Sequence, residues 1–259
     1  MIICQSYKVK TKAKIRLQTQ NVSKSFAGEL TIKDISIVLK ENELVSLLGV
    51  SGIGKSTLFN VIAGVSIPDS GKVLQDGIDI TGQAGKVSYM QQKDLMQPHL
   101  TVLDNVALPL FIRGMNKRLA RAEALKHFVE FGIEGTERKY PTQLSGGMRQ
   151  RAALLRTYLF SGDVALFDEP FSALDAITKN AMHRWYLNLM DRINMSALFI
   201  THDIDEAILL SDRIYIMTGP PGVIAHEIII DTPKPRGDDF LVSDTFINYK
   251  RLIIKLLSV

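Results

Sequence analysis

Apolar residues along the chain fall into short runs rich in β-branched side chains, which alternate with stretches whose apolar residues recur at helical spacing. This alternation predicts an α/β fold with a largely parallel sheet. Pro220, Pro221, Pro233 and Pro235 punctuate the last part of the chain. The runs expected to form strands are 43–48, 87–90, 164–167, 197–200 and 213–217.

The strand pattern stops between about residues 93 and 156. Leu119, Ala122, Leu125 and Phe128 recur there at helical spacing, which predicts a helical lobe inserted into the α/β core. Further on, an amphipathic pattern predicts a short closing helix over about 243–258, with Phe246, Ile253 and Leu256 on one face. No repeat or long linker interrupts the chain, so we expect residues 1–259 to form one domain.

Composition limits the classes of protein that fit. The apolar content of 46% is enough for a substantial core, and the single cysteine permits no intrachain disulfide, so a reducing compartment is expected. No stretch approaches the roughly 20 apolar residues of a membrane-spanning helix. The first residues also lack the charge order of a secretory signal.

The net charge of +4 comes partly from basic residues near the start of the chain. Such a segment can contact anionic lipid or nucleic acid, but a solvated tail leading into an edge strand is the favoured interpretation. No recognisable nucleic-acid-binding module supports the alternative, and no nucleic-acid partner is expected. The basic residues are Lys8, Lys10, Lys12, Lys14 and Arg16.

The sequence GVSGIGKST at residues 49–57 lies between an apolar strand pattern and a helical pattern, as a phosphate-binding loop requires. Glycines allow the backbone to approach phosphate oxygens, Lys55 adds a positive charge toward the β- and γ-phosphates, and the Ser56 hydroxyl is placed to bind Mg²⁺. A chance match in a glycine-containing turn is disfavoured by this context. The residues expected to contact nucleotide are Gly49, Val50, Ser51, Gly52, Ile53, Gly54, Lys55, Ser56 and Thr57.

Two carboxylates follow the apolar run 164–167. Neighbouring strand residues point in opposite directions, so we expect Asp168 to hold Mg²⁺ and Glu169 to polarise the water that attacks the γ-phosphate. The alternative is a turn with solvated charges. The phosphate loop upstream argues against it, because the carboxyl ends of strands in such folds meet around the ligand.

Three single residues are weaker candidates. His202 follows the apolar run 197–200 and can contact the γ-phosphate, although a lone histidine is often structural. Gln92 follows another strand and can reach Mg²⁺ or the attacking water, or simply form polar surface. Phe26 can stack on a nucleobase, or belong to the core.

LSGGMRQ at residues 144–150 is typical of an anion site at a helix start. Ser145 lies where an N-cap is expected, and the amides of Gly146 and Gly147 can face a phosphate. Met148 shares a helical stripe with Ala152, Leu155 and Leu159 and is expected to anchor the helix rather than contact nucleotide.

Together these segments resemble the nucleotide-binding subunits of ABC transporters in order and spacing across nearly the whole chain. The resemblance implies a P-loop NTPase core with an N-terminal antiparallel β region and an inserted helical lobe. It also implies an ATPase that binds ATP and Mg²⁺. The segments are GVSGIGKST, Gln92 within YMQQKD, LSGGMRQR, LFDEPFSALD and THD.

The resemblance assigns roles by position. Phe26 matches the aromatic residue that stacks on adenine, and Glu169 matches the catalytic base. Gln92, Asp175 and His202 match the Q-loop glutamine, the D-loop aspartate and the switch histidine of the family. Lys55 joins these as a catalytic residue. The sequence departs from the family pattern at Ser172, where related importers often carry glycine, and in its basic N-terminal extension.

The resemblance also implies partners. LSGG has no lysine of its own, so its phosphate is expected to come from a second copy, in a homodimer that sandwiches two ATP molecules. That dimer is expected to drive separate integral membrane permease subunits at the cytoplasmic face of the membrane and to depend indirectly on a solute-binding protein. The permease would dock near residues 95–110.

Within the family, the chain looks most like importers of nitrate, sulfonates, taurine or pyrimidine precursors of thiamine. An exporter subunit shares all five segments and is the alternative. A soluble ABC ATPase of translation or DNA repair is disfavoured, because such proteins usually carry tandem modules or long coiled-coil inserts.

Overall fold

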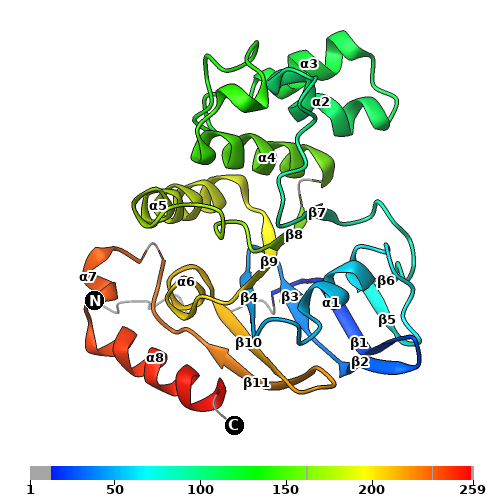
Figure 1. Ribbon diagram of the computed structural model, residues 1–259, viewed down its shortest axis with the longest axis vertical. Helices are drawn as coiled ribbons and strands as arrows, with labels where there is room; N and C mark the ends of the chain where they lie inside the picture. Colours follow the sequence, from blue (N-terminus) through cyan, green and yellow to red (C-terminus); the bar gives the residue numbers. More distant parts are fainter. Residues whose placement is uncertain (1–12, 162, 235, 258–259) are drawn as a thin grey trace, which may run out of the picture.

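A computed structural model describes residues 13–161, 163–234 and 236–257 of the chain. Its central element is a six-stranded sheet with strand order β11-β10-β4-β9-β8-β7, parallel except for the β10–β11 pair (Figure 1). All five predicted strands are present in this sheet. The strands are β4 (Leu44–Leu48), β7 (Ser88–Met90), β8 (Val164–Asp168), β9 (Ser196–Thr201), β10 (Arg213–Thr218) and β11 (Val223–Ile229).

A second, antiparallel sheet is built mainly from the N-terminal part of the described chain, which confirms the expected antiparallel β region. Its order is β2-β1-β5-β6, and β3 also pairs with β1. One apolar cluster joins this sheet to helix α1 (Lys55–Ile62) and to the six-stranded sheet, with Leu17, Phe59 and Ile200 among its buried members. The strands are β1 (Ile15–Phe26), β2 (Glu29–Ile35), β3 (Val38–Lys40), β5 (Ser70–Gln75) and β6 (Ile78–Asp79).

Between β7 and β8 the described chain is helical, and this part forms the upper lobe of Figure 1. Its core continues into helix α5 (Ala176–Ile193) and the buried faces of β8 and β9. The elements of the lobe are α2 (Val102–Ile112), α3 (Lys117–Leu125), the 3₁₀ helix η1 (Pro141–Gln143) and α4 (Gly146–Ser161).

The prediction that Leu119, Ala122, Leu125 and Phe128 form one apolar face of a helix is wrong in part. Helix α3 ends at Leu125 and buries Ala120 and Ala124, whereas Leu119 is 58% exposed and Leu125 is 46% exposed. Small side chains face α2 because they allow the two helices to approach closely. Phe128 is buried, but it lies in the turn after the helix.

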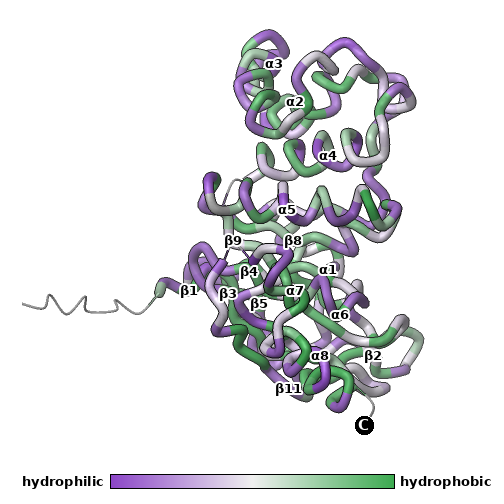
Figure 2. The backbone as a smooth tube through the Cα atoms, turned by 90° about the vertical axis from the view of Figure 1, so that its left-hand side faces the viewer, coloured by the Kyte–Doolittle hydropathy of each residue, from purple (hydrophilic) through white to green (hydrophobic). Residues whose placement is uncertain are grey.

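Three short helices complete the described chain: α6 (Ile204–Leu210), α7 (Asp238–Leu241) and α8 (Asp244–Leu257). Helix α8 buries Phe246 and Ile253 against a cluster that contains Ile214 of β10, and hydrophilic and hydrophobic positions alternate along it in Figure 2. Among the described residues, no helix combines the length and apolar character needed to span a bilayer.

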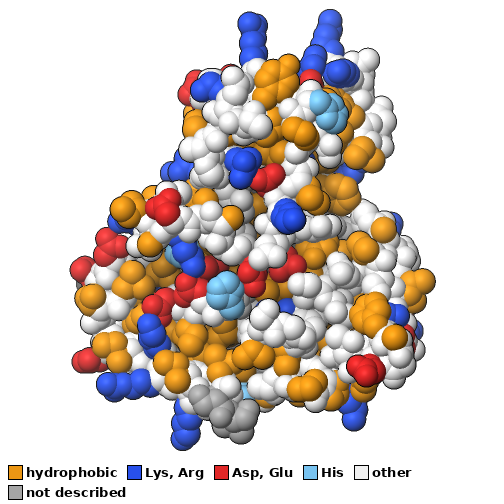
Figure 3. Space-filling view, in the orientation of Figure 1, with side chains coloured by type: hydrophobic (Ala, Val, Ile, Leu, Met, Phe, Trp, Pro, Cys, Tyr) orange, Lys and Arg blue, Asp and Glu red, His pale blue; other side chains and the backbone are white. Residues whose placement is uncertain are grey.

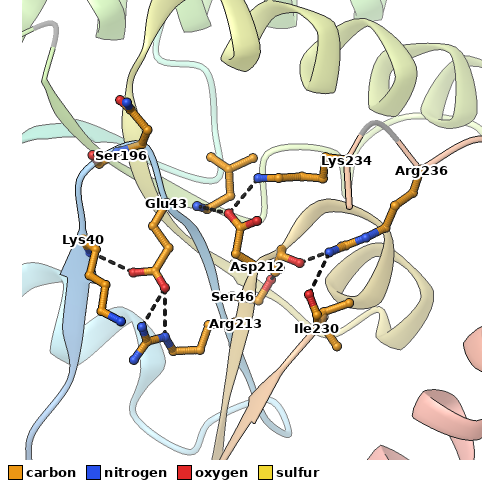
Figure 4. Close-up of polar contacts among 12 residues, drawn as sticks. Lys40, Glu43, Ser46, Ser196, Asp212, Arg213, Ile230, Lys234 and Arg236 are labelled. Carbon is orange, nitrogen blue, oxygen red and sulfur yellow. Dashed lines mark hydrogen bonds and ion pairs between the residues drawn. The ribbon is translucent and has the colours of Figure 1, made fainter. Parts of the chain in front are cut away.

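A polar cluster lies at the amino end of β10, beside a cleft of about 440 Å³ (Figure 4). Glu43 and Arg213 are 9% and 8% exposed, and Glu43 Oε1 accepts hydrogen bonds of 2.7 and 2.9 Å from the guanidinium. Glu43 Oε2 accepts one of 2.7 Å from the Lys40 amide, while Asp212 pairs with Lys234 at 2.7 Å. These charges satisfy one another and tie β3 to β10, which indicates a structural role.

Candidate functional site

The carboxyl ends of β4, β8 and β9 meet at one edge of the sheet, where a cleft of about 500 Å³ opens. The space-filling view in Figure 3 shows acidic side chains and a histidine gathered near the middle of this face. The cleft contains residues from all four segments that were expected to follow a strand. These are the phosphate loop, Gln92, the pair Asp168 and Glu169, and His202. Its lining residues are Thr31, Ser51, Gly52, Gly54, Lys55, Ser56, Thr57, Gln92, Asp168, Glu169, Ile200 and His202.

The loop between β4 and α1 requires glycine for its shape. Gly52 has φ +80°, and Gly54, the N-cap of α1, has φ +105°, both in the left-handed region. A Cβ on Gly54 would also lie 2.5 Å from Cγ2 of Ile32. No side chain caps the helix start, and its first turn contains no acidic residue. The amides and the helix dipole at this end therefore suit an anion.

Lys55 is only 7% exposed, and its Nζ donates hydrogen bonds to the carbonyls of Gly49 (2.7 Å) and Val50 (2.8 Å). Burial lowers the pKa of Lys55, while the negative charges of Glu169 and Asp168 act in the opposite direction. The loop thus positions a lysine ammonium group beside two carboxylates at the same edge.

Glu169 lies at the centre of a set of polar contacts. Its Oε2 accepts a 3.1 Å hydrogen bond from Nε2 of Gln92, and its Oε1 lies 3.1 Å from Nδ1 of His202. Its backbone φ is +47°, unusual for a residue other than glycine, and its amide donates to the Ile200 carbonyl at 3.1 Å. Strained backbone of this kind is found preferentially at functional sites.

Asp168 is buried, at 8% exposure, at the end of β8. Burial raises its pKa, and hydrogen bonds with Ser56 and Tyr89 partly offset this effect. A carboxylate and a serine hydroxyl in contact are hard oxygen ligands of the kind that Mg²⁺ takes together with nucleotide phosphates. The residues present therefore fit a magnesium ion. No group of three or more His, Cys, Asp or Glu within the described ranges forms a separate metal site.

The remaining candidates lie outside the lining of this cleft. Phe26 is 52% exposed at the end of β1, with Lys24 Nζ 5.5 Å above its ring. Ser145 accepts a 3.3 Å hydrogen bond from the Met148 amide, so it occupies the N-cap position of α4, and Met148 is half-buried. Ser145, Gly146 and Gly147, called the signature residues from here on, lie at the start of α4 in the helical lobe.

Asp175 uses its carboxylate within its own chain. Its Oδ1 accepts hydrogen bonds from the amides of Ile177 (3.1 Å) and Thr178 (3.0 Å), which makes it the N-cap of α5. A hydrogen bond with the Thr178 side chain, together with those from the two amides, lowers the pKa of Asp175.

Three residues at the site were not predicted from the sequence. Thr31 and Ile200 line the cleft, and the Tyr89 hydroxyl donates a 3.3 Å hydrogen bond to Oδ2 of Asp168. Thr31 comes from the antiparallel sheet, so no local pattern marks it. For Tyr89, strand alternation is a usable signal, because Ser88 and Met90 are buried on the face opposite to it.

A glycine-rich loop entering a helix, beside a buried aspartate and a glutamate at the end of another parallel strand of the same sheet, defines a P-loop nucleoside triphosphatase. The model of the ABC transporter family matches residues 32–172, more than half of the chain. The chain belongs to this family, and it is an ATP-binding ATPase.

Relatives and solved structures agree with this assignment. The formylaminopyrimidine import ATP-binding protein ThiZ of Halalkalibacterium halodurans is 47% identical over 190 residues, 73% of this chain and 74% of that protein. The nitrate transport protein NasD of Klebsiella oxytoca is 38% identical and covers 91% of this chain and 93% of its own length. The dimeric bacterial ABC transporter cassette MJ0796 is 28% identical with TM-score 0.71, covering 84% of this chain and 100% of its own.

Proposed function

We propose that this chain powers an importer of a small solute of the nitrate, sulfonate, taurine or thiamine-precursor pyrimidine kind. It would act as a homodimer attached to separate permease subunits at the cytoplasmic face of the membrane, with a solute-binding protein as an indirect partner. The site of Lys55, Asp168 and Glu169 at one sheet edge carries the ATPase part of the proposal. Similarity to proteins named for formylaminopyrimidine and nitrate transport supports the importer part.

In this mechanism the loop amides and Lys55 bind the phosphates of ATP and stabilise the charge that develops during transfer. Glu169 accepts a proton from the attacking water, and Gln92 and His202, each 3.1 Å from its carboxylate, orient that group and the γ-phosphate. A magnesium ion held by Ser56, Asp168 and Gln92 would neutralise phosphate charge. Phe26 would stack on adenine.

The dimer would complete each site with a second copy. Ser145, Gly146 and Gly147 start α4 outside their own chain's cleft, with Ser145 and Gly146 exposed. An isologous two-fold dimer would bring this helix start to the γ-phosphate held by the other copy, and Asp175 at the start of α5 beside it. A dimeric arrangement is known for the MJ0796 cassette.

The permease would dock in an apolar groove of about 380 Å³ between α2 and the body of the chain. Ile112, Leu95 and Phe160 line this groove, and Ile112 is 74% exposed. Gln91 lines it too, directly before Gln92 of the catalytic site. An amphipathic helix of the permease fits such a groove, and its binding would move the glutamine contact to Glu169.

The test uses the chain assembled with a permease and a solute-binding protein, which are to be sought among the proteins encoded beside its gene. Ile112→Glu should keep ATP binding but lose solute-stimulated hydrolysis. Val129→Glu, which changes another exposed apolar residue outside the groove lining, should retain that stimulation. Normal stimulation in Ile112→Glu would refute docking at this groove. Mass spectrometry of solute captured by the binding protein then tests the solute class, and a solute of another chemistry would refute that part.

A further inference from the structure

Tyr89 lies at the boundary between the catalytic cleft and the apolar groove, because its side chain lines the groove and its hydroxyl reaches Asp168. It occupies the middle of β7, half-buried, while Ser88 and Met90 on the opposite face are buried. It lines the apolar groove together with Gln91 and Ile112. The same side chain therefore faces the docking groove and reaches toward the nucleotide site.

The hydroxyl of Tyr89 makes the link to the site. It donates a 3.3 Å hydrogen bond to Oδ2 of Asp168, the carboxylate suited to Mg²⁺. A hydrogen bond from a neighbouring side chain orients a metal-binding carboxylate and so directs its remaining lone pairs toward the metal.

The ring of Tyr89 is held from a third direction. It packs edge-on against Phe59 of α1, with ring centroids 6.0 Å apart and an interplanar angle of 78°. Phe59 lies in the helix that begins at Lys55 and carries Ser56. The ring is thus braced by the phosphate-loop helix, and movement of the groove wall can be transmitted to Asp168.

We propose that Tyr89 is a positioning residue that orients Asp168 for Mg²⁺ and makes the nucleotide site sensitive to occupancy of the groove. Three contacts define this role: the hydroxyl on Asp168, the ring on Phe59, and the exposed part of the side chain in the groove. The link to groove occupancy rests on the proposed docking function, whereas the orientation of Asp168 does not.

The test compares Tyr89→Phe with the unchanged chain, using the full-length purified protein. Phenylalanine keeps the ring packing and the groove wall but removes the hydrogen bond. The measurements are the thermal shift produced by ATP in EDTA and the Mg²⁺ concentration that gives half of the additional shift. The first should be unchanged. The second should rise about 10-fold, the usual effect of removing a hydrogen bond to a metal ligand.

Tyr215→Phe is the matched control. Its hydroxyl accepts a 3.2 Å hydrogen bond from the Val38 amide and lies outside the lining of the nucleotide cleft, so its loss should lower the melting temperature without moving the Mg²⁺ midpoint. An unchanged Mg²⁺ midpoint in Tyr89→Phe overturns the positioning role, and so does an equal shift in both variants.

The transmission part has its own measurement in the assembled transporter at saturating Mg²⁺. Tyr89→Phe should reduce the ratio of solute-stimulated to basal hydrolysis, and an unaltered ratio would overturn transmission. Ile112→Glu distinguishes failure of docking from failure of the Tyr89 proposal. This variant should lose stimulation by solute while the Mg²⁺ midpoint of the isolated chain stays unchanged.

Discussion

The hydroxyl of Ser172 donates a 3.0 Å hydrogen bond to the backbone carbonyl of Glu169, and the Ser172 amide donates another of 3.2 Å to the same oxygen. Glu169 has φ +47°, so its backbone needs support from its surroundings. The family resemblance marks Ser172 as a departure from the pattern of related importers, and no motif of the sequence connects this serine with the chemistry. The structure gives it a contact with the proposed catalytic base.

Ser172→Ala should therefore lower the turnover number about 2- to 10-fold, as expected for one neutral hydrogen bond of about 0.5–1.5 kcal/mol. ATP binding should not change, because the phosphate loop is untouched. Steady-state kinetics and ATP titration measure the two effects. Ser243→Ala is the control, since Ser243 makes the same bond to the carbonyl three residues before it, Phe240, near α8. Equal turnover in both variants would show that the contact does not matter.

Glu169→Gln should preserve ATP binding and prolong the closed dimer while reducing hydrolysis by about 10²–10⁴-fold. Glutamine keeps the size of the side chain and can still contact Gln92 and His202, but it cannot accept a proton. Single-turnover hydrolysis and size-exclusion chromatography with ATP measure the two effects. Glu134→Gln, at an exposed site in the lobe, should behave as the unchanged protein. Wild-type turnover in Glu169→Gln would show that Glu169 is not the catalytic base.

The strands of the six-stranded sheet were predictable because they are buried runs. All five residues of β8 and all six of β9 are buried, so their apolar character appears directly in the sequence. The buried face of α3 was not predictable in the same way. Ala120 and Ala124 face α2, and the larger Leu119 and Leu125 are exposed, because distance between helices rather than hydrophobicity decides which residues fit.

The site divides along similar lines. Residues whose spacing is fixed by the chain, such as Lys55 and Ser56, could be placed from the loop pattern. Contacts between elements that are distant in the sequence could not be predicted in this way. Examples are the place of Thr31 in the cleft and the Tyr89–Asp168 hydrogen bond. They depend on how the antiparallel sheet and β7 pack around the cleft.

The helical lobe should lose stability at acid pH through Asp104. Its carboxylate accepts hydrogen bonds of 2.6 and 2.7 Å from Arg121, and this pairing lowers its pKa from the ordinary 3.8. A carboxyl group whose pKa is depressed by folding stabilises the protein above its ordinary pKa, and this contribution is lost as the pH falls through the folded-state value.

Asp104→Asn should therefore reduce the free energy of unfolding at pH 7 by about 1–2 kcal/mol, less than for a buried pair because Arg121 is partly exposed. Below pH 3 the difference from the unchanged chain should shrink. Urea unfolding between pH 7 and pH 2 measures it. Asp231→Asn, at an exposed aspartate, should show no such pH-dependent difference. A constant difference at all pH values would contradict the assignment to the Asp104–Arg121 pair.

Ser145→Arg should block ATP-driven dimerisation without preventing ATP binding by the monomer. Ser145 caps α4 with a 3.3 Å hydrogen bond from the Met148 amide and is exposed, so an arginine there projects from the surface rather than into its own core. Ser145→Ala separates the two effects, because it removes the cap, at about 1 kcal/mol, without adding bulk. Met148→Gln should be nearly silent, since that side chain is only half-buried. Light scattering with ATP in the Glu169→Gln background measures the dimer. If the Ser145→Arg dimer still closes normally, the signature residues do not contact the other copy's nucleotide.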